Sequence, residues 1–158
     1  MKKYLFCLAA FALGLTACDN YFDEIYDLLV KTGTDKQVVI KTYDNLATIQ
    51  SKTKNDVVHK SIFMPIINLD KKEDAEQVLN DYMAVKPAAY EVVFKKESQK
   101  LFSVLEKIKA SGSKLWINSL WASLTAGHDD DLAVEEGKPN DAWGWILDQG
   151  ATVIQTNR

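Results

Sequence analysis

The residues that could ligate a metal ion or transfer a proton are few, and four of them are consecutive. The chain has two histidines, His59 and His128, and the second opens a run at residues 128–131 that continues with three aspartates. Imidazole nitrogens and carboxylate oxygens are common metal ligands. Consecutive side chains, however, cannot all point at one cation without a tight turn. We therefore interpret this run as a solvated acidic loop, with a metal site as the alternative.

Two charged residues belong to short apolar runs. Glu91 lies within residues 90–94, and Lys41 ends the run at residues 37–41. A buried carboxylate is costly unless it is paired, so Glu91 either faces outward or has a function. Lys41 could contact a phosphate as a point charge, although a solvated lysine at a strand end is the favoured interpretation.

Aromatic side chains gather near the acidic run. Trp121 precedes it, and Trp143 and Trp145 follow it. Indole rings at the mouth of a site could bind an apolar or sugar group, whereas helix packing explains Trp143 equally well. Both interpretations stay open at the level of sequence.

The elements that must position these residues alternate along the chain. Short β-branched or aromatic runs recur every 25 to 35 residues or so, with helical stretches between them, which is typical of βα units with parallel strands. The sequence therefore predicts an α/β fold, either a doubly wound sheet or part of a (β/α)₈ barrel. The expected strands are residues 37–41, 62–67, 90–94, 114–118 and 151–155, and the expected helices are residues 22–32, 46–49, 71–84, 98–110 and 141–148.

Two segments depart from this regular pattern. Pro65 falls inside the second expected strand, where its missing N–H favours an edge strand or a bulge. Residues 119–140 contain no clear apolar period, and we expect them to form a long loop.

The first 17 residues resemble an export signal. Lys2 and Lys3 precede an apolar stretch at residues 4–15, which is too short for a membrane span of about 20 residues. Residues 15–18 (Leu-Thr-Ala-Cys) resemble a bacterial lipobox, in which Cys18 is acylated. We predict a lipoprotein signal peptide at residues 1–17, a tether at residues 18–21 and one domain at residues 22–158. An ordinary signal peptide or a short N-terminal anchor is the alternative.

Composition limits the partners of the predicted mature protein. Cleavage before Cys18 would leave 141 of the 158 residues, with 17 basic and 22 acidic residues and a net charge of −5. That charge argues against nucleic acid as a partner, and a single cysteine excludes an internal disulfide. Acidic residues after Cys18 resemble the tether of surface lipoproteins or form an acidic first helical turn. They are Asp19, Asp23, Glu24 and Asp27.

Two segments resemble strands of the glycerophosphodiester phosphodiesterase family. Residues 112–118 (GSKLWIN) resemble the strand written G-x-x-V-x-V-W-T-V-N, and residues 150–158 (GATVIQTNR) resemble the last strand, G-V-D-x-I-x-T-D-R-P. The three earlier runs are similar to the family's strands four to six. Residues 118–121 and 127–130 resemble the sequence of a branch of this family that is found in Bacteroides-type bacteria. The resemblance implies strands four to eight of a TIM barrel, over about residues 20–158.

The resemblance implies an activity that this chain would lack on its own. The family hydrolyses glycerophosphodiesters to glycerol 3-phosphate and an alcohol, with a divalent cation such as Ca²⁺ or Mg²⁺. Its chemistry is carried chiefly by a His-Arg-Gly motif and a Glu-x-Asp pair on earlier strands. This sequence contains neither, and Asn157 occupies the position of a family aspartate. We therefore expect no catalytic residue, no metal and no cofactor in this chain, and no activity by itself.

The resemblance also indicates substrate-facing positions. Trp116 matches a strand tryptophan that contacts substrate in the family, with core packing as the alternative, and Asn118 ends the same strand. With Lys41 and Glu91, these are the four substrate-facing candidates. The alternative function is a non-catalytic surface lipoprotein that binds a ligand, a second copy or the missing half of the barrel. In each case we expect export and lipid anchoring to a membrane of a Gram-negative bacterium. A third hypothesis is a gene damaged by internal deletion and early termination, with no stable product.

Overall fold

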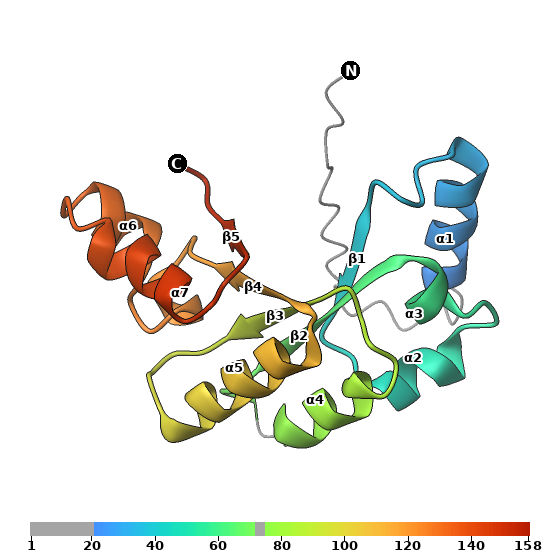
Figure 1. Cartoon of the computed structure of the whole chain (residues 1–158). Coiled ribbons are helices and arrows are strands. Elements are labelled where there is room, and N and C mark those ends of the chain that lie inside the picture. Colours follow the sequence, from blue (N-terminus) through green and yellow to red (C-terminus); the bar gives the residue numbers. More distant parts are fainter. Residues whose placement is uncertain (1–20, 72–74) are drawn as a thin grey trace.

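Five parallel strands form one sheet in the computed structural model, which describes residues 21–71 and 75–158 (Figure 1). The strands lie in the order of the sequence, β1-β2-β3-β4-β5. The predicted α/β fold with five parallel strands is therefore confirmed. The strands are β1 (Val39–Thr42), β2 (Ile62–Asn68), β3 (Ala89–Val93), β4 (Lys114–Asn118) and β5 (Val153–Gln155).

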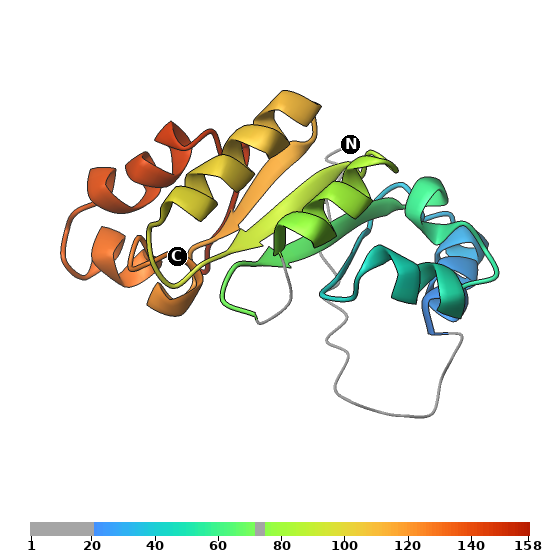
Figure 2. The same ribbon diagram turned by 90° about the horizontal axis from the view of Figure 1, so that it is seen from below.

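Helices carry the chain back between the parallel strands, as this strand arrangement requires. Helices α4 (Ala75–Met83) and α5 (Gln99–Ser111) lie against one face of the sheet, as Figure 2 shows. Helices α1 (Tyr21–Thr32), α2 (Leu46–Lys52) and α3 (Val57–Lys60) lie on the side of β1 (Figure 1). The remaining helices lie on the side of β5.

The main hydrophobic core fills the space between the sheet and the helices that pack against it. Successive strand residues point to opposite faces, and Ile40, Phe63, Val92 and Ile117 point into this core. Helix α5 supplies the apolar stripe that its sequence period predicts. The buried residues of that stripe are Leu101, Val104, Leu105 and Ile108.

The opposite face of the sheet, called here the inner face, carries the predicted site residues. Register pairs Glu91 with Trp116 and Trp116 with Val153, so these side chains share one face. The other residues of the inner face occupy the matching alternate positions of their strands. The inner face includes Val39, Lys41, Met64, Glu91, Trp116, Asn118, Val153 and Gln155.

The predicted loop at residues 119–140 and the predicted helix at 141–148 both need correction. The loop contains a 3₁₀ turn, η1 (Ala122–Leu124), and a short helix, α6 (Asp130–Val134). The helix is divided into a π-helical turn, η2 (Asn140–Gly144), and α7 (Trp145–Asp148). Short helices of this kind depend on tertiary contacts rather than on intrinsic propensity.

Pro65 lies on β2, which has a neighbouring strand on each side, so of the two alternatives, an edge strand or a bulge, the edge strand was wrong. β2 pairs with β1 through residues 62–65 and with β3 from Ile66 onward. Pro65 therefore falls where the recorded pairing passes from one neighbour to the other, and a missing N–H interrupts the ladder least at that point.

The predicted signal peptide and Cys18 lie outside the described residues. The mature-domain boundary predicted at residue 22 falls in the first turn of α1, which starts at Tyr21. None of the helices in residues 21–71 and 75–158 has the length and apolar character needed to cross a membrane.

Candidate functional site

Lys41 and Glu91 form a buried ion pair on the inner face. The Lys41 ammonium lies 2.8 Å from Glu91 Oε2, and the two side chains are only 9% and 3% exposed. The interpretation of Lys41 as a solvated strand-end residue was therefore wrong. Glu91 also does not face outward, and its burial is compensated by the pairing that a buried carboxylate requires.

Gln155 and Trp116 complete this cluster. Gln155 Oε1 accepts hydrogen bonds from Lys41 Nζ at 3.3 Å and from Trp116 Nε1 at 3.2 Å. The Lys41 ammonium also lies 5.9 Å from the centre of the Trp116 ring. Trp116 packs against Val39 and Met64, so it contributes both to packing and to the polar cluster.

Asn118 lies beside this cluster at the carboxyl end of β4. It is 7% exposed, and its Oδ1 accepts a hydrogen bond from the backbone N–H of Leu120 at 3.1 Å. Asn118 is the register partner of Gln155 on β5. The four predicted substrate-facing residues therefore lie on one face, and Gln155 is a fifth that sequence reasoning missed. Two features of the sequence could have indicated Gln155: it lies on the same face of its strand as Val153, and it ends that strand.

A small cleft lies at the carboxyl ends of β1 and β2, where ligands of parallel sheets commonly bind. The Lys71 ammonium lies 4.5 Å from the centre of the Tyr43 ring at its rim. Partial burial raises the pKa of the Tyr43 hydroxyl, and the negative charge of Glu91 acts in the same direction. The lining residues are Tyr43, Ile66, Ile67, Asn68, Lys71, Ala75 and Val78.

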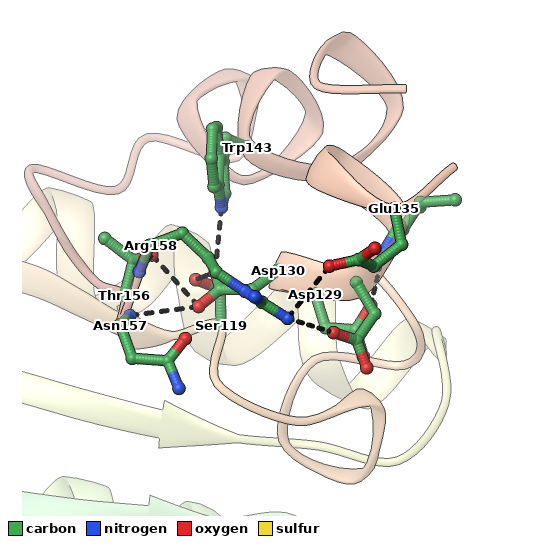
Figure 3. A network of polar contacts seen from close by, with 10 residues as sticks. Ser119, Asp129, Asp130, Glu135, Trp143, Thr156, Asn157 and Arg158 are labelled. Carbon is green, nitrogen blue, oxygen red and sulfur yellow. Dashed lines mark hydrogen bonds and ion pairs between the residues drawn. The ribbon is translucent and has the colours of Figure 1, made fainter. Parts of the chain in front are cut away.

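Asp130 is the centre of a second polar network, and the interpretation of its run as a solvated acidic loop was wrong. Its side chain is 1% exposed. One carboxylate oxygen accepts hydrogen bonds from Ser119 Oγ at 2.5 Å and Trp143 Nε1 at 3.0 Å, and the other from Thr156 Oγ1 at 2.9 Å and the Asn157 N–H at 3.1 Å (Figure 3). Asp130 therefore joins the residue after β4, the turn η2 and the residues after β5.

The hydrogen bonds to Asp130 favour its carboxylate form. Burial acts to raise its pKa, but the hydrogen bonds from Ser119, Asn157, Trp143 and Thr156 outweigh burial and hold the pKa below its usual value. Asp129 is also buried and caps α6 by accepting from the Leu132 N–H at 3.0 Å. The acidic run is thus largely structural.

Arg158 extends this network over α6 (Figure 3). Its guanidinium lies 3.0 Å from Asp131 Oδ1 and 3.2 Å from Glu135 Oε1. Since these groups are largely exposed, the pairs contribute little to stability. Asn157 contributes its backbone N–H to Asp130.

His128 contacts acceptors through both ring nitrogens. Nδ1 lies 2.7 Å from the carbonyl oxygen of Asp141, and Nε2 lies 3.1 Å from Glu97 Oε1. The ring stacks on Trp145 with centroids 3.8 Å apart. The other histidine, His59, pairs with Asp56 at the surface. Within the described residues, no three His, Cys, Asp or Glu side chains are grouped so that they could hold a metal ion.

The three tryptophans near the acidic run have separate environments. Trp143 donates to Asp130, Trp145 stacks on His128, and Trp121 is 60% exposed. Packing and hydrogen bonding therefore explain Trp143 and Trp145, whereas Trp121 is available at the surface.

Comparison with known proteins gives a family without an assigned activity. A family model described as a domain of unknown function, DUF4996, matches residues 63–158, which is more than half of the chain. The match begins at Phe63 in β2 and includes Glu91, Trp116, Asn118 and Gln155, but not Lys41. No curated protein matches the chain.

Proposed function

Because the chain belongs to the DUF4996 family, whose description gives no activity, we propose a function from its own residues. The chain is the C-terminal part of a glycerophosphodiester phosphodiesterase-like barrel. Its inner face binds a phosphodiester-like ligand, and the chain by itself does not hydrolyse that ligand. The TIM-barrel assignment, with β1 to β5 as strands four to eight, is part of this proposal.

One observation carries the proposal. Lys41, Glu91 and Trp116 come from three different strands, and they converge with Gln155 in one polar cluster on the inner face. Asn118 lies on the same face next to Gln155. Convergence of polar side chains at the carboxyl ends of parallel strands is how barrel enzymes bind their substrates.

The same cluster supports binding rather than hydrolysis. The Lys41 charge is balanced by Glu91 at 2.8 Å, so this ion pair supplies no net positive charge for a phosphoryl transition state. The sequence also contains no His-Arg-Gly and no Glu-x-Asp motif to supply an acid, a base or metal ligands in the family's manner.

Hydrolysis is tested by incubating the full chain with glycerophosphocholine and Ca²⁺ or Mg²⁺ and measuring glycerol 3-phosphate. We expect no release above the buffer control, while a complete glycerophosphodiester phosphodiesterase measured in parallel releases product. Turnover by this chain would contradict the proposed lack of activity.

A second candidate function is that of a surface lipoprotein that pairs with another chain. The edge strands β1 and β5 each pair on one side only in the described sheet, and open strand edges can pair with further strands. Size-exclusion chromatography of the protein starting after Cys18 separates the possibilities. A dimer supports pairing with a second copy, and a stable monomer contradicts it.

The lipid anchor is proposed from the lipobox-like residues before Cys18. Expression of the full chain in a Gram-negative bacterium should place it in the membrane fraction with an acyl-dependent mass increase. Cys18→Ser should remove both. Retention of Cys18→Ser in that fraction would contradict acyl anchoring.

A further inference from the structure

We propose that the side-chain amides of Asn118 and Gln155 form a donor pair that binds an oxyanion carrying a single negative charge. The inference rests on the proposed ligand-binding function of the inner face, and it names the residues and the ligand charge that this face selects.

The two residues are placed as a pair by the sheet. Asn118 ends β4, Gln155 ends β5, and the β4–β5 register pairs them directly. Trp116 lies two residues before Asn118, and its indole N–H reaches Gln155, so all three side chains share the inner face. Neighbouring strands lie about 4.8 Å apart, which is close enough for two side chains to contact one small anion.

The hydrogen bonds of the two amide oxygens fix the orientation of both groups. The Leu120 N–H needs an acceptor, which is Asn118 Oδ1. Lys41 Nζ and Trp116 Nε1 are both donors, so the atom between them must be Gln155 Oε1. Each residue is therefore left with its NH₂ group, and neither NH₂ has a partner in the described part of the chain. Asn118 is 7% exposed as a residue, but its NH₂ nitrogen is not among the fully buried side-chain atoms without a partner, so this donor is open to a ligand.

The charges around the pair select the ligand. Amide NH₂ groups only donate at these positions, which requires an acceptor such as a phosphate, carboxylate or other oxyanion. The nearby Lys41–Glu91 pair carries no net charge. A singly charged oxyanion is compatible with neutral donors, whereas a dianion would approach the Glu91 carboxylate without an added positive charge. The pair therefore favours a phosphodiester or a carboxylate over a phosphate monoester.

Matched variants separate the effect of losing the NH₂ donors from the effects of side-chain positioning and of added charge. Gln155→Glu keeps an oxygen for Lys41 and Trp116 but removes the NH₂ donors, and Gln155→Met removes the donors without adding charge. Asn118→Asp keeps the acceptor for Leu120. Gln50→Glu, on the exposed surface of α2, is the control for added charge.

The direct measurement is the ¹⁵N–¹H spectrum of the full chain during titration with glycerophosphocholine, inorganic phosphate or acetate. We expect the Asn118 and Gln155 NH₂ signals to move together with glycerophosphocholine or acetate, and to move less with phosphate, which is mostly a dianion at pH 7.5. Each of the three donor-removing variants should weaken binding by about tenfold or more, while Gln50→Glu should not. A response to acetate alone would identify a carboxylate rather than a phosphodiester as the ligand.

The outcomes distinguish the two proposals. If the Trp116 indole N–H signal moves while both NH₂ pairs stay fixed, the inner face binds ligand and the donor pair is wrong. A loss of affinity in Gln155→Glu but not in Gln155→Met would also overturn donation by Gln155, because charge repulsion would explain it. If no inner-face signal moves with any probe, both the donor pair and the proposed binding function are wrong.

Discussion

At the scale of single residues, the buried ion pair has the largest predicted effect on stability. Lys41→Met leaves the Glu91 carboxylate buried without its partner, and breaking a buried pair costs about 3–5 kcal/mol. We expect urea denaturation to show a loss of this size in the free energy of unfolding. Lys100→Met, at an exposed position of α5, is the control and should have little effect.

The double variant Lys41→Met/Glu91→Met tests the cause of that loss. Since it removes both charges together, most of the stability should return. A double variant as unstable as Lys41→Met would show that lost packing, rather than the uncompensated carboxylate, causes the effect.

Asp130 makes stability depend on acidic pH. Its pKa lies below the ordinary aspartate value of 3.8 because its hydrogen bonds outweigh burial. The unfolded chain therefore binds this proton first as the pH falls, so the stabilisation is complete above about pH 4 and is lost as the pH falls through the folded-state pKa. Acidification below about pH 4 should therefore lower the free energy of unfolding.

Asp130→Asn should reduce this acid dependence, and it should cost about 2 kcal/mol at neutral pH because an NH₂ group then faces hydrogen-bond donors. Asp23 adds acid dependence of the same sign, because backbone hydrogen bonds outweigh burial and lower its pKa. Some dependence should therefore remain. Denaturation curves between pH 3 and pH 7 measure both effects, with exposed Asp148→Asn as the control. An unchanged acid dependence in Asp130→Asn would contradict this assignment.

Sequence reasoning found the charged residues of the site but not their partners. Glu91 had to be paired or exposed on energetic grounds, yet its partner Lys41 is 50 residues away, and no local pattern links the two. Gln155 was missed because an amide at a strand end has no distinctive signal by itself. Asp130 was misinterpreted for the same reason, since its four donors come from three separate segments of the chain.

At the scale of elements, the N-cap of α5 is a local feature with a measurable contribution. Ser98 Oγ accepts from the Leu101 N–H at 3.2 Å, and replacing a serine N-cap by alanine costs about 1 kcal/mol. Ser98→Ala should therefore lower the free energy of unfolding by that amount in urea. Ser103→Ala, inside the same helix, should leave stability unchanged or slightly raised. Equal effects of the two changes would show that Ser98 does not act as a cap.

Long amphipathic elements were predictable, and short ones fixed by distant contacts were not. The apolar period of residues 98–110 predicts α5 to within a residue or so of its bounds, Gln99–Ser111. Helix α6 has five residues, and it depends on the Asp129 cap and the Asp130 network. Intrinsic propensity cannot stabilise so short a helix alone. Pro65 led to a different kind of error. The rule that proline favours edge strands uses only the local sequence, whereas the position of β2 is set by the neighbouring strands β1 and β3.

At the scale of the whole molecule, one core joins the two ends of the described chain. The main cluster includes Phe22 of α1 and Ala151 just before β5, and a smaller cluster on the inner face joins Val39 to Met64 and Trp116. Because both clusters join residues before Phe63 to the DUF4996 match, the chain is expected to unfold in a single cooperative transition. This organisation means that residues before Phe63, which include Lys41 of the site, should stabilise the segment that holds the other inner-face site residues.

Ile49→Ala tests this coupling, because Ile49 is fully buried in α2 while all four tryptophans lie at Trp116 or beyond. Truncating a buried isoleucine costs about 2–4 kcal/mol. If the core is one cooperative unit, the urea midpoint measured by tryptophan fluorescence should fall as far as the midpoint measured by far-ultraviolet circular dichroism. Leu147→Ala, at a residue 56% exposed, is the control and should shift neither. A fluorescence midpoint that stays fixed while the dichroism midpoint falls would divide the molecule into two units, and the inner-face site would then have to be stable without α2.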